Sequence, residues 1–360
     1  EGLVGSEMCI RDRFLIDPKR DPEQEYTIHL FEFCNLRCAF CWQNHEDTIG
    51  TENVMDKLPS VEKFISKELM QKVTFNVMGG EVFAPAIYTK KLNEGYKLFV
   101  KGIQKICDHY NKKCVINWVS NLVTTPEGNE QILDLITWSR QEGIETRLTT
   151  SYDPRGSFNK KDFEIFKSNV EYWGDEVTCF SCLLTKPNIR YYLEEGDEYF
   201  DYLYNKGKYI YFDYYMPDEN AKYQMPSDEL LLKFFKHCVD KYPNVHPVRD
   251  WIFNKKNYAS CRVSKLILAD GTLCQCGNLV QDEKSLSQYK SPIKRKDNSI
   301  IENSFLEKYN CASCEFLDRC TLGCFMNHDY RYKEELNECV YKLTHRYIED
   351  VRVQRNYIAT

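Results

Sequence analysis

The chain has 360 residues, of which 42% are hydrophobic and 28% charged, and a formal net charge of −6. This composition excludes collagen, low-complexity disorder and a membrane-embedded protein, since no window approaches the roughly 18 apolar residues of a spanning helix. The acidic balance gives no general attraction to nucleic acid or anionic lipid, so we expect neither as a partner. Seventeen cysteines stand out, because a chain this long folds without disulfides and an odd number cannot pair completely.

The N-terminal segment, residues 1–13, reads EGLVGSEMCIRDR. It lacks the basic start and the apolar run of about 7–15 residues that mark a signal peptide. The segment resembles translated sequencing-adapter sequence. We therefore expect an artefact or a disordered start, and Cys9 is left out of the reasoning.

From Tyr26 onwards, short apolar β-rich runs alternate with helical patterns. Strands separated by helices of this length pair in parallel through right-handed crossovers. Six such units predict an α/β fold, either a doubly wound sheet or an open barrel, and periodicity does not separate the two. The expected strands are 26–33, 73–78, 114–120, 145–151, 177–185 and 209–215, and the expected helices are 61–71, 88–110, 129–142, 160–173, 189–205 and 227–241.

Polar and glycine-rich motifs follow the first four expected strands. They are CNLRCAFC at 34–41, GGE at 79–81, Ser120-Asn121, and Ser151-Tyr152-Asp153. In barrel-type α/β folds the loops after the carboxyl ends of the strands carry the chemistry. The pattern therefore indicates a catalytic face.

The first motif places Cys34, Cys38 and Cys41 at the spacing C-x3-C-x2-C. A loop this short can wrap one compact metal centre. A [4Fe–4S] cluster normally has four cysteine ligands, so three would leave one iron open to an external ligand. The alternative is a four-ligand zinc site completed by His45. The asymmetric triplet favours the cluster.

The motif C-x3-C-x-Φ-C, with Phe40 as the apolar residue, resembles the radical SAM superfamily. The resemblance implies a partial (β/α)6 TIM-like barrel and a [4Fe–4S] cluster whose open iron chelates S-adenosylmethionine. It further implies reductive cleavage of that cofactor to a 5′-deoxyadenosyl radical, with an electron donor such as flavodoxin or ferredoxin. Cofactors of this kind carry the difficult chemistry, while the protein positions them and excludes water.

Other strand-end residues match the same family. Gly79-Gly80-Glu81 resembles its GGE motif, which contacts the methionyl amino group, although Val82 stands where the family usually has proline. Glycines permit close backbone approach, and a carboxylate can accept from an ammonium group. Asn121 resembles a ribose-contacting residue and Ser151 the serine of an SxD segment. For both, capping of a strand end is the alternative role.

The C-terminal third resembles the seven-cysteine SPASM pattern: Cys261-x9-Gly271-x4-Cys276, then C-x2-C-x5-C-x3-C from Cys311 to Cys324, then Cys339. A pair of zinc ribbons fits these spacings poorly. The resemblance implies two auxiliary [4Fe–4S] clusters. Cys274 is either a fourth ligand of the first or a small buried residue. The first set is Cys261, Cys276 and Cys324, and the second is Cys311, Cys314, Cys320 and Cys339.

The expected domains are a barrel over 24–245, a SPASM domain over 250–345, and a C-terminal helix or tail over 346–360. About 20 credible residues precede Cys34, so we expect a leader-binding domain to be either absent or lost with the true N-terminus. The remaining cysteines at 107, 114, 179, 182 and 238 are expected to be buried as small hydrophobic residues.

The resemblance, over about residues 26–345, favours an oxidoreductase or maturase that abstracts hydrogen from a peptide or protein side chain. A dehydrogenase or epimerase of a small molecule such as a sugar is the alternative. Sulfatase maturases have an aspartate where this chain has Gly277, which disfavours that specialised class. Thiolate-bound iron is lost where disulfides form, so we expect a cytoplasmic location.

Two non-enzymatic interpretations of the cysteines make different predictions. A zinc-binding module predicts about three zinc ions and no iron, whereas three [4Fe–4S] clusters predict about twelve iron atoms. A secreted disulfide protein is disfavoured by the odd cysteine count and by the missing signal peptide.

Overall fold

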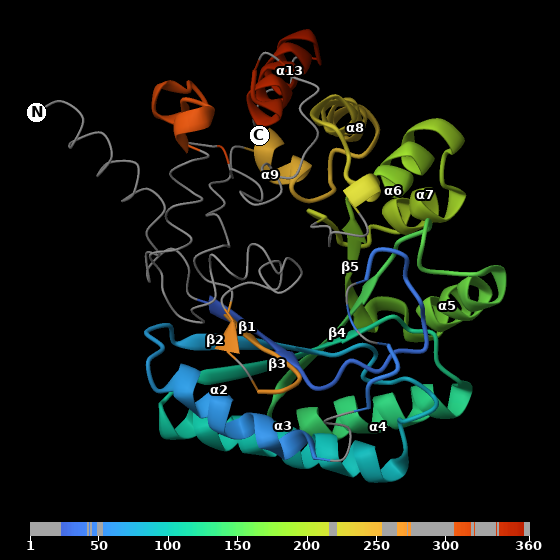
Figure 1. The fold of residues 1–360 in the computed structure, drawn as a ribbon, viewed down its shortest axis with the longest axis vertical. Coiled ribbons are helices and arrows are strands. Elements are labelled where there is room, and N and C mark those ends of the chain that lie inside the picture. Colours follow the sequence, from blue (N-terminus) through green and yellow to red (C-terminus); the bar gives the residue numbers. More distant parts are fainter. Residues whose placement is uncertain are drawn as a thin grey trace, which may run out of the picture. The chain divides into compact units, whose positions relative to one another are not determined.

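A computed structural model describes residues 23–41, 43, 45–48, 53–215, 222–253, 265–271, 273–274, 306–317, 320, 336 and 338–355. The chain divides into two compact units (Figure 1). Unit 1 comprises residues 1–16, 182–262 and 294–360, and unit 2 comprises residues 17–181 and 263–293. Each unit is described by itself.

The strands in the described part of the chain form one sheet, in the order β6-β5-β4-β3-β2-β1-β7-β8. Seven strands are parallel and form a curled half-barrel, and β8 runs antiparallel to β7. This confirms the partial barrel expected from the sequence. The strands are β1 (Glu23–His29), β2 (Lys72–Met78), β3 (Lys113–Ser120), β4 (Glu145–Ser151), β5 (Val177–Leu183), β6 (Ile210–Asp213), β7 (Lys265–Ile267) and β8 (Leu273–Cys274).

The helices alternate with the strands much as expected, and the largest difference lies at 189–205. The single helix expected over 189–205 is three segments. Gly196, with a φ of +72°, ends the second, and the Asp197 carboxylate caps the third by accepting from the Tyr199 and Phe200 N–H groups. The helices are α2 (Leu58–Ile65), α3 (Lys90–His109), α4 (Pro126–Gln141), α5 (Lys160–Trp173), α6 (Lys186–Arg190), a π-helical segment (Tyr191–Glu195), α7 (Glu198–Asn205), α8 (Asp228–Lys241), α9 (Val248–Ile252) and α13 (Val340–Arg355).

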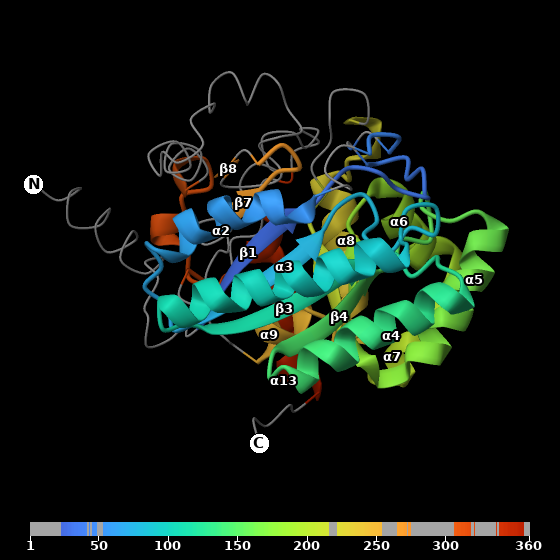
Figure 2. The ribbon, with the colours of Figure 1, turned by 90° about the horizontal axis from the view of Figure 1, so that it is seen from below.

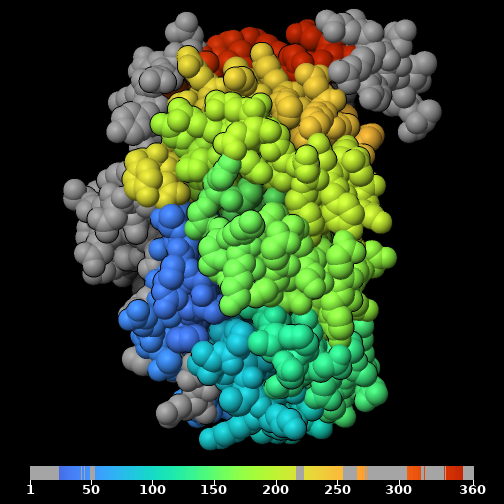
Figure 3. Space-filling view, turned by 90° about the vertical axis from the view of Figure 1, so that its right-hand side faces the viewer, coloured from blue at the N-terminus to red at the C-terminus, as the bar shows by residue number. Residues whose placement is uncertain are grey.

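In unit 2 the two faces of the sheet differ in chemistry. On the outer face, α3 and α4 cover apolar side chains such as Phe75 and Trp118, both fully buried (Figure 2). Side chains alternate along a strand, so the residues between these point to the inner face. On β4 the inner positions, from Glu145 to Ser151, are only half-buried. The outer face therefore supplies the core, and the inner face stays polar. In Figure 3 the side of the molecule that carries the green segment around α5 faces the viewer.

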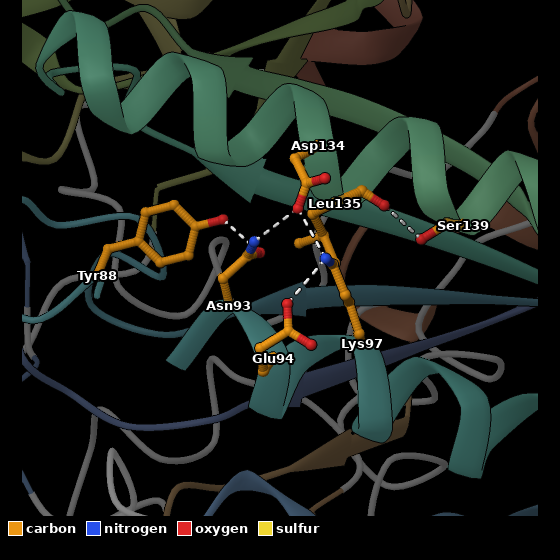
Figure 4. A network of polar contacts seen from close by, with 7 residues as sticks. All are labelled: Tyr88, Asn93, Glu94, Lys97, Asp134, Leu135 and Ser139. Carbon is orange, nitrogen blue, oxygen red and sulfur yellow. Dashed lines mark hydrogen bonds and ion pairs between the residues drawn. The ribbon is translucent and has the colours of Figure 1, made fainter. Parts of the chain in front are cut away.

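A polar network joins α3 to α4 beneath the sheet (Figure 4). Tyr88 donates to the Asn93 amide oxygen at 2.9 Å, and the Asn93 amide donates to Asp134 at 3.1 Å. Lys97 pairs with Asp134 at 2.7 Å and with Glu94 at 2.9 Å. Asn93 is buried, so its amide supplies hydrogen bonds that water cannot easily replace.

Strand β7 was not expected from the sequence. It pairs in parallel with β1, for example Thr27 with Leu266, and so belongs to unit 2. The turn after it is held against α2 by the Ser60 hydroxyl, which donates to the Gly271 carbonyl at 3.3 Å. Three residues are too few for a periodic pattern, which explains the omission. The domain boundaries stay predictions.

In unit 1 the C-terminal helix α13 packs on α8 and α9 through aromatic rings. Trp251 lies 5.0 Å from Phe235 and 6.1 Å from Tyr341, centroid to centroid. Within the residues described, no helix combines the length and the apolar character needed to cross a membrane.

We expect Asn93→Ala to lower the free energy of unfolding by about 1–3 kcal/mol, because the buried Tyr88 hydroxyl loses its acceptor. The exposed neighbour in the same network provides the control: Glu94→Gln should change it by less than about 0.5 kcal/mol. Urea denaturation measures both, and equal effects would contradict the role given to Asn93.

Candidate metal centre

The three thiols of the first motif lie together in the loop after β1. Cys34 is buried, Cys38 and Cys41 are half-buried, and none of the three is in a disulfide. Burial raises the pKa of Cys34 to about 12, with further contributions from Glu81 and from the other two thiols. Burial likewise raises the pKa of Cys38 to about 12. The sulfur atoms are therefore close enough to interact electrostatically, as ligands of one centre must be.

Backbone contacts hold this loop in a compact shape. The Cys41 N–H donates to the Cys38 carbonyl at 3.0 Å, and the Leu36 N–H lies 3.4 Å from the Cys34 sulfur. The Ala39 N–H donates to the Gly156 carbonyl at 2.9 Å, which ties the loop to the segment after β4. The loop thus wraps around its own sulfur atoms.

Gly79 and Gly80 lie directly against the chain that leads into Cys34. The Gly80 N–H donates to the Phe31 carbonyl at 2.9 Å. A Cβ atom on Gly80 would stand 2.1 Å from the Glu32 carbonyl oxygen, far inside contact distance. The glycines were expected to allow approach to a ligand. The described contact that requires Gly80 is instead an approach of the chain to itself.

Glu81 is a buried carboxylate that connects the loop after β2 with the end of β3. One of its oxygens accepts from the Phe83 N–H and the Ser120 hydroxyl, both at 2.9 Å, and the other accepts from the Asn121 N–H at 2.5 Å. Burial raises its pKa to about 7 despite these three donors. A carboxylate has about four lone-pair sites, so one is left for an ammonium group. The predicted contact to the methionyl amino group stays a prediction.

The structure places Asn121 beside the first cysteine. Its amide nitrogen lies 3.8 Å from the Cys34 sulfur and donates to the Asn35 side-chain oxygen at 3.0 Å. Its own side-chain oxygen accepts from the Val123 N–H at 2.8 Å, which is the capping role weighed against a ribose contact. Ser151 is half-buried at the end of β4. Ligand contacts by either residue stay predictions.

Sequence reasoning missed Ser157 and His29. The Ser157 hydroxyl hydrogen-bonds to Cys38, and Asp153, which the sequence placed in the loop after β4, lies close enough to raise the pKa of Cys38. His29 ends β1, and burial lowers its pKa to about 4; its ring nitrogen lies 3.2 Å from the Gln43 amide. The position of His29 at a strand end was the available signal.

Part of the second cysteine set lies together in unit 1. Burial first, and then the neighbouring Cys339 and Cys314, raise the pKa of Cys311 to about 12. The Cys314 N–H donates to the Cys311 carbonyl, and the Cys320 N–H to the Phe316 carbonyl. Cys261, Cys276 and Cys324 lie outside the described residues, and of Cys274 only the backbone, in β8, is described.

The donor sets fit sulfur-ligated iron at both places. Cys34, Cys38 and Cys41 lie in one short loop, Cys311 and Cys314 lie in another with Cys339 near Cys311, and thiolates are the ligands that hold iron–sulfur clusters. Cys34 and Cys311 are buried, and the other thiols are half-buried. No three His, Cys, Asp or Glu side chains are grouped as ligands of a single metal ion in the part of the chain that the structure describes.

Comparison with known proteins identifies the fold. No protein-family model matches, and no curated protein matches. Among solved structures, anSMEcpe with bound AdoMet and the Cp18Cys peptide matches with a TM-score of 0.63 at 15% identity, covering 93% of this chain and 98% of that one. The chain has the fold of the radical SAM enzymes. The same protein with AdoMet alone gives a TM-score of 0.61 at 15% identity over 93% and 100% of the two chains.

The radical SAM resemblance of the sequence is thereby confirmed at the level of fold. Residues that follow β1, β2, β3 and β4 meet around Cys34 and Cys38.

We expect Gly80→Ala to lower the free energy of unfolding by about 1–3 kcal/mol and to reduce bound iron after reconstitution, because the new methyl group displaces the backbone before Cys34. Gly95→Ala is the matched control. A Cβ atom there, inside α3, meets only Val54 at 3.9 Å, so it should stabilise by about 0.5–1 kcal/mol. Urea denaturation and iron analysis measure both, and full iron content in Gly80→Ala would contradict the expectation.

Proposed function

We propose that this chain is a radical SAM enzyme with three [4Fe–4S] clusters that abstracts hydrogen from a peptide or protein side chain. The observation that carries the proposal is the group of three thiols outside any disulfide, Cys34, Cys38 and Cys41, in the loop after β1. The shared fold with an enzyme whose structures hold AdoMet and a peptide supports the cofactor and the substrate class.

Three thiolates would hold a cluster and leave one iron for the amino and carboxylate groups of S-adenosylmethionine. When bound, the cluster and this cofactor supply the electron and the 5′-deoxyadenosyl radical. Glu81 then has two tasks: it holds the loops after β2 and β3 together, and its remaining lone-pair site accepts from the methionyl ammonium group. Asn121 orients the Cys34 thiolate through its amide nitrogen. Cys34 and Glu81 are buried, which would keep water away from a bound cluster.

The cysteines of the second constellation would bind two auxiliary clusters that carry electrons, with a flavodoxin or ferredoxin as the external donor. Cys311, Cys314, Cys320 and Cys339 supply one site. We assign Cys261, Cys276 and Cys324 to the other because the SPASM resemblance implies it, with Cys274 as its fourth ligand. Because free thiols and thiolate-bound iron persist only under reducing conditions, we place the reaction in the cytoplasm.

Anaerobic iron, sulfide and zinc analysis tests the cluster assignment directly. The proposal expects about twelve iron atoms per chain, and zinc without iron would overturn it. Reduction with dithionite in the presence of S-adenosylmethionine should then yield 5′-deoxyadenosine.

We expect Cys38→Ala to abolish 5′-deoxyadenosine formation, because two thiolates cannot hold the cluster that binds the cofactor. Cys179→Ala, a half-buried cysteine outside every proposed set, should retain the activity. Liquid chromatography of the reaction measures both, and undiminished product from Cys38→Ala would refute the site.

We expect Cys314→Ala to lose about four iron atoms while substrate-free cleavage of S-adenosylmethionine persists, because the two cysteine sets lie in different units. Iron analysis and the same chromatographic assay, run on one preparation, separate the two effects. Loss of all iron, or no loss, would contradict independent sites.

A further inference from the structure

The inner face of unit 2 carries a row of polar side chains below the thiols. The row runs across four strands: Glu25 on β1, Asn76 on β2, Asn117 on β3 and Thr149 on β4. Asn76 and Asn117 are directly paired, and Thr149 is a diagonal neighbour of Asn117. Asn121 follows β3 directly, four residues beyond Asn117, and its amide nitrogen lies 3.8 Å from the Cys34 sulfur. The row therefore lies on the wall beneath the proposed site.

Hydrogen bonds in this row determine which way each amide points. The Glu25 carboxylate can only accept, so the Asn76 amide nitrogen must face it, at 3.3 Å. The Asn76 oxygen then faces β3 and accepts from the Asn117 amide nitrogen at 2.8 Å. That nitrogen also donates to the Thr149 hydroxyl oxygen, at 3.3 Å. The charge on Glu25 thus orients the whole row.

This arrangement leaves one acceptor and one donor side by side. The Asn117 side-chain oxygen is buried and accepts no hydrogen bond, and Asn117 is only 9% exposed. Thr149 uses its oxygen as an acceptor from Asn117, so its hydroxyl hydrogen remains available to an outside group. A buried acceptor without a partner costs about 1–3 kcal/mol, and a bound donor removes that cost.

We infer that Asn117 and Thr149 recognise an amide group of the substrate. A primary amide, such as an Asn or Gln side chain, presents one N–H and its C=O on the same side, the complement of the Asn117 oxygen and the Thr149 hydroxyl; in a trans backbone amide these two groups point in opposite directions. A sugar hydroxyl could satisfy either residue, but a primary amide offers a fixed donor and a fixed acceptor side by side. This inference rests on the proposed function and narrows its substrate to a peptide held by the side-chain amide of an Asn or Gln residue.

The test measures binding without any turnover. The purified full-length protein is equilibrated, without reductant, with a synthetic library of N-acetylated, C-amidated random octapeptides, and separately with a mixture of hexoses. Retained molecules are identified by mass spectrometry, and their Kd values are measured. We expect the protein to retain a subset of peptides and no hexose. Retention of no peptide, or of hexoses instead, would overturn the inference.

Variants then locate the contact. Asn117→Leu and Thr149→Val should each raise the Kd of the retained peptides about tenfold, the size of one lost hydrogen bond of ~1.4 kcal/mol, and Thr149→Ser should restore it. Thr146→Val is the matched control, since Thr146 lies on the same strand but points to the outer face and donates to the Ile144 carbonyl at 3.2 Å. Unchanged affinity in Asn117→Leu and Thr149→Val would overturn the inference. If Asn117→Leu fails to fold, the Thr149 pair still decides it.

Replacement of each Asn or Gln of a retained peptide by Leu, one at a time, completes the cycle. One replaced position should lose about tenfold or more in affinity for the unmodified protein and clearly less for Asn117→Leu. Equal losses in both proteins would contradict an amide contact at Asn117. Because the binding assay involves no turnover, a failure here is distinct from a failure of the proposed function, which iron analysis and 5′-deoxyadenosine formation report.

Discussion

The close contact between the Gly79-Gly80 backbone and the chain before Cys34 is the constraint on which the candidate site depends. It extends the pairing of β1 with β2 past the ends of both strands: Leu30 donates to Met78, Gly80 to Phe31 and Glu81 to Phe33. No side chain fits at Gly80, so only glycine allows this contact. The contact sets where the cysteine loop starts and turns Glu81 towards β3.

Glu81 extends this arrangement from two strands to three. A buried carboxylate is costly unless donors surround it, and the loops after β2 and β3 provide them through Phe83, Ser120 and Asn121. The same carboxylate acts on the Cys34 thiol, so the group that joins the loops also shapes the electrostatics of the proposed centre. On the wall below, another carboxylate, Glu25, orients a row of neutral amides. In both places an acceptor-only group determines the direction of neighbouring hydrogen bonds.

Much of the fold could be predicted because local patterns were strong. β4 and α5 have the expected bounds: 145–151 contains three threonines, a residue type that favours strands, and an unbroken helical period runs through 160–173. The expectation over 189–205 was wrong because one capping residue, Asp197, restarts the helix, an effect that periodicity does not register. α2 ends earlier than expected, at Ile65, because the Glu68 carboxylate accepts from the Leu69 and Met70 N–H groups and from Tyr26. Strand β7 was missed because a three-residue strand exists only through its partner β1.

The amino-acid sequence by itself determined the chemistry: which residues are thiols, how many lie within one loop, and that glycines and a carboxylate follow the next strand. Spacing along the chain suffices for this, because Cys34, Cys38 and Cys41 lie within eight residues and so must be near one another. The tertiary structure alone decided what each residue touches. Gly80 meets backbone, Ser157 reaches Cys38, and the Asn117 oxygen is left without a donor. These contacts join strands that are tens of residues apart, and only the register of the parallel sheet brings them together.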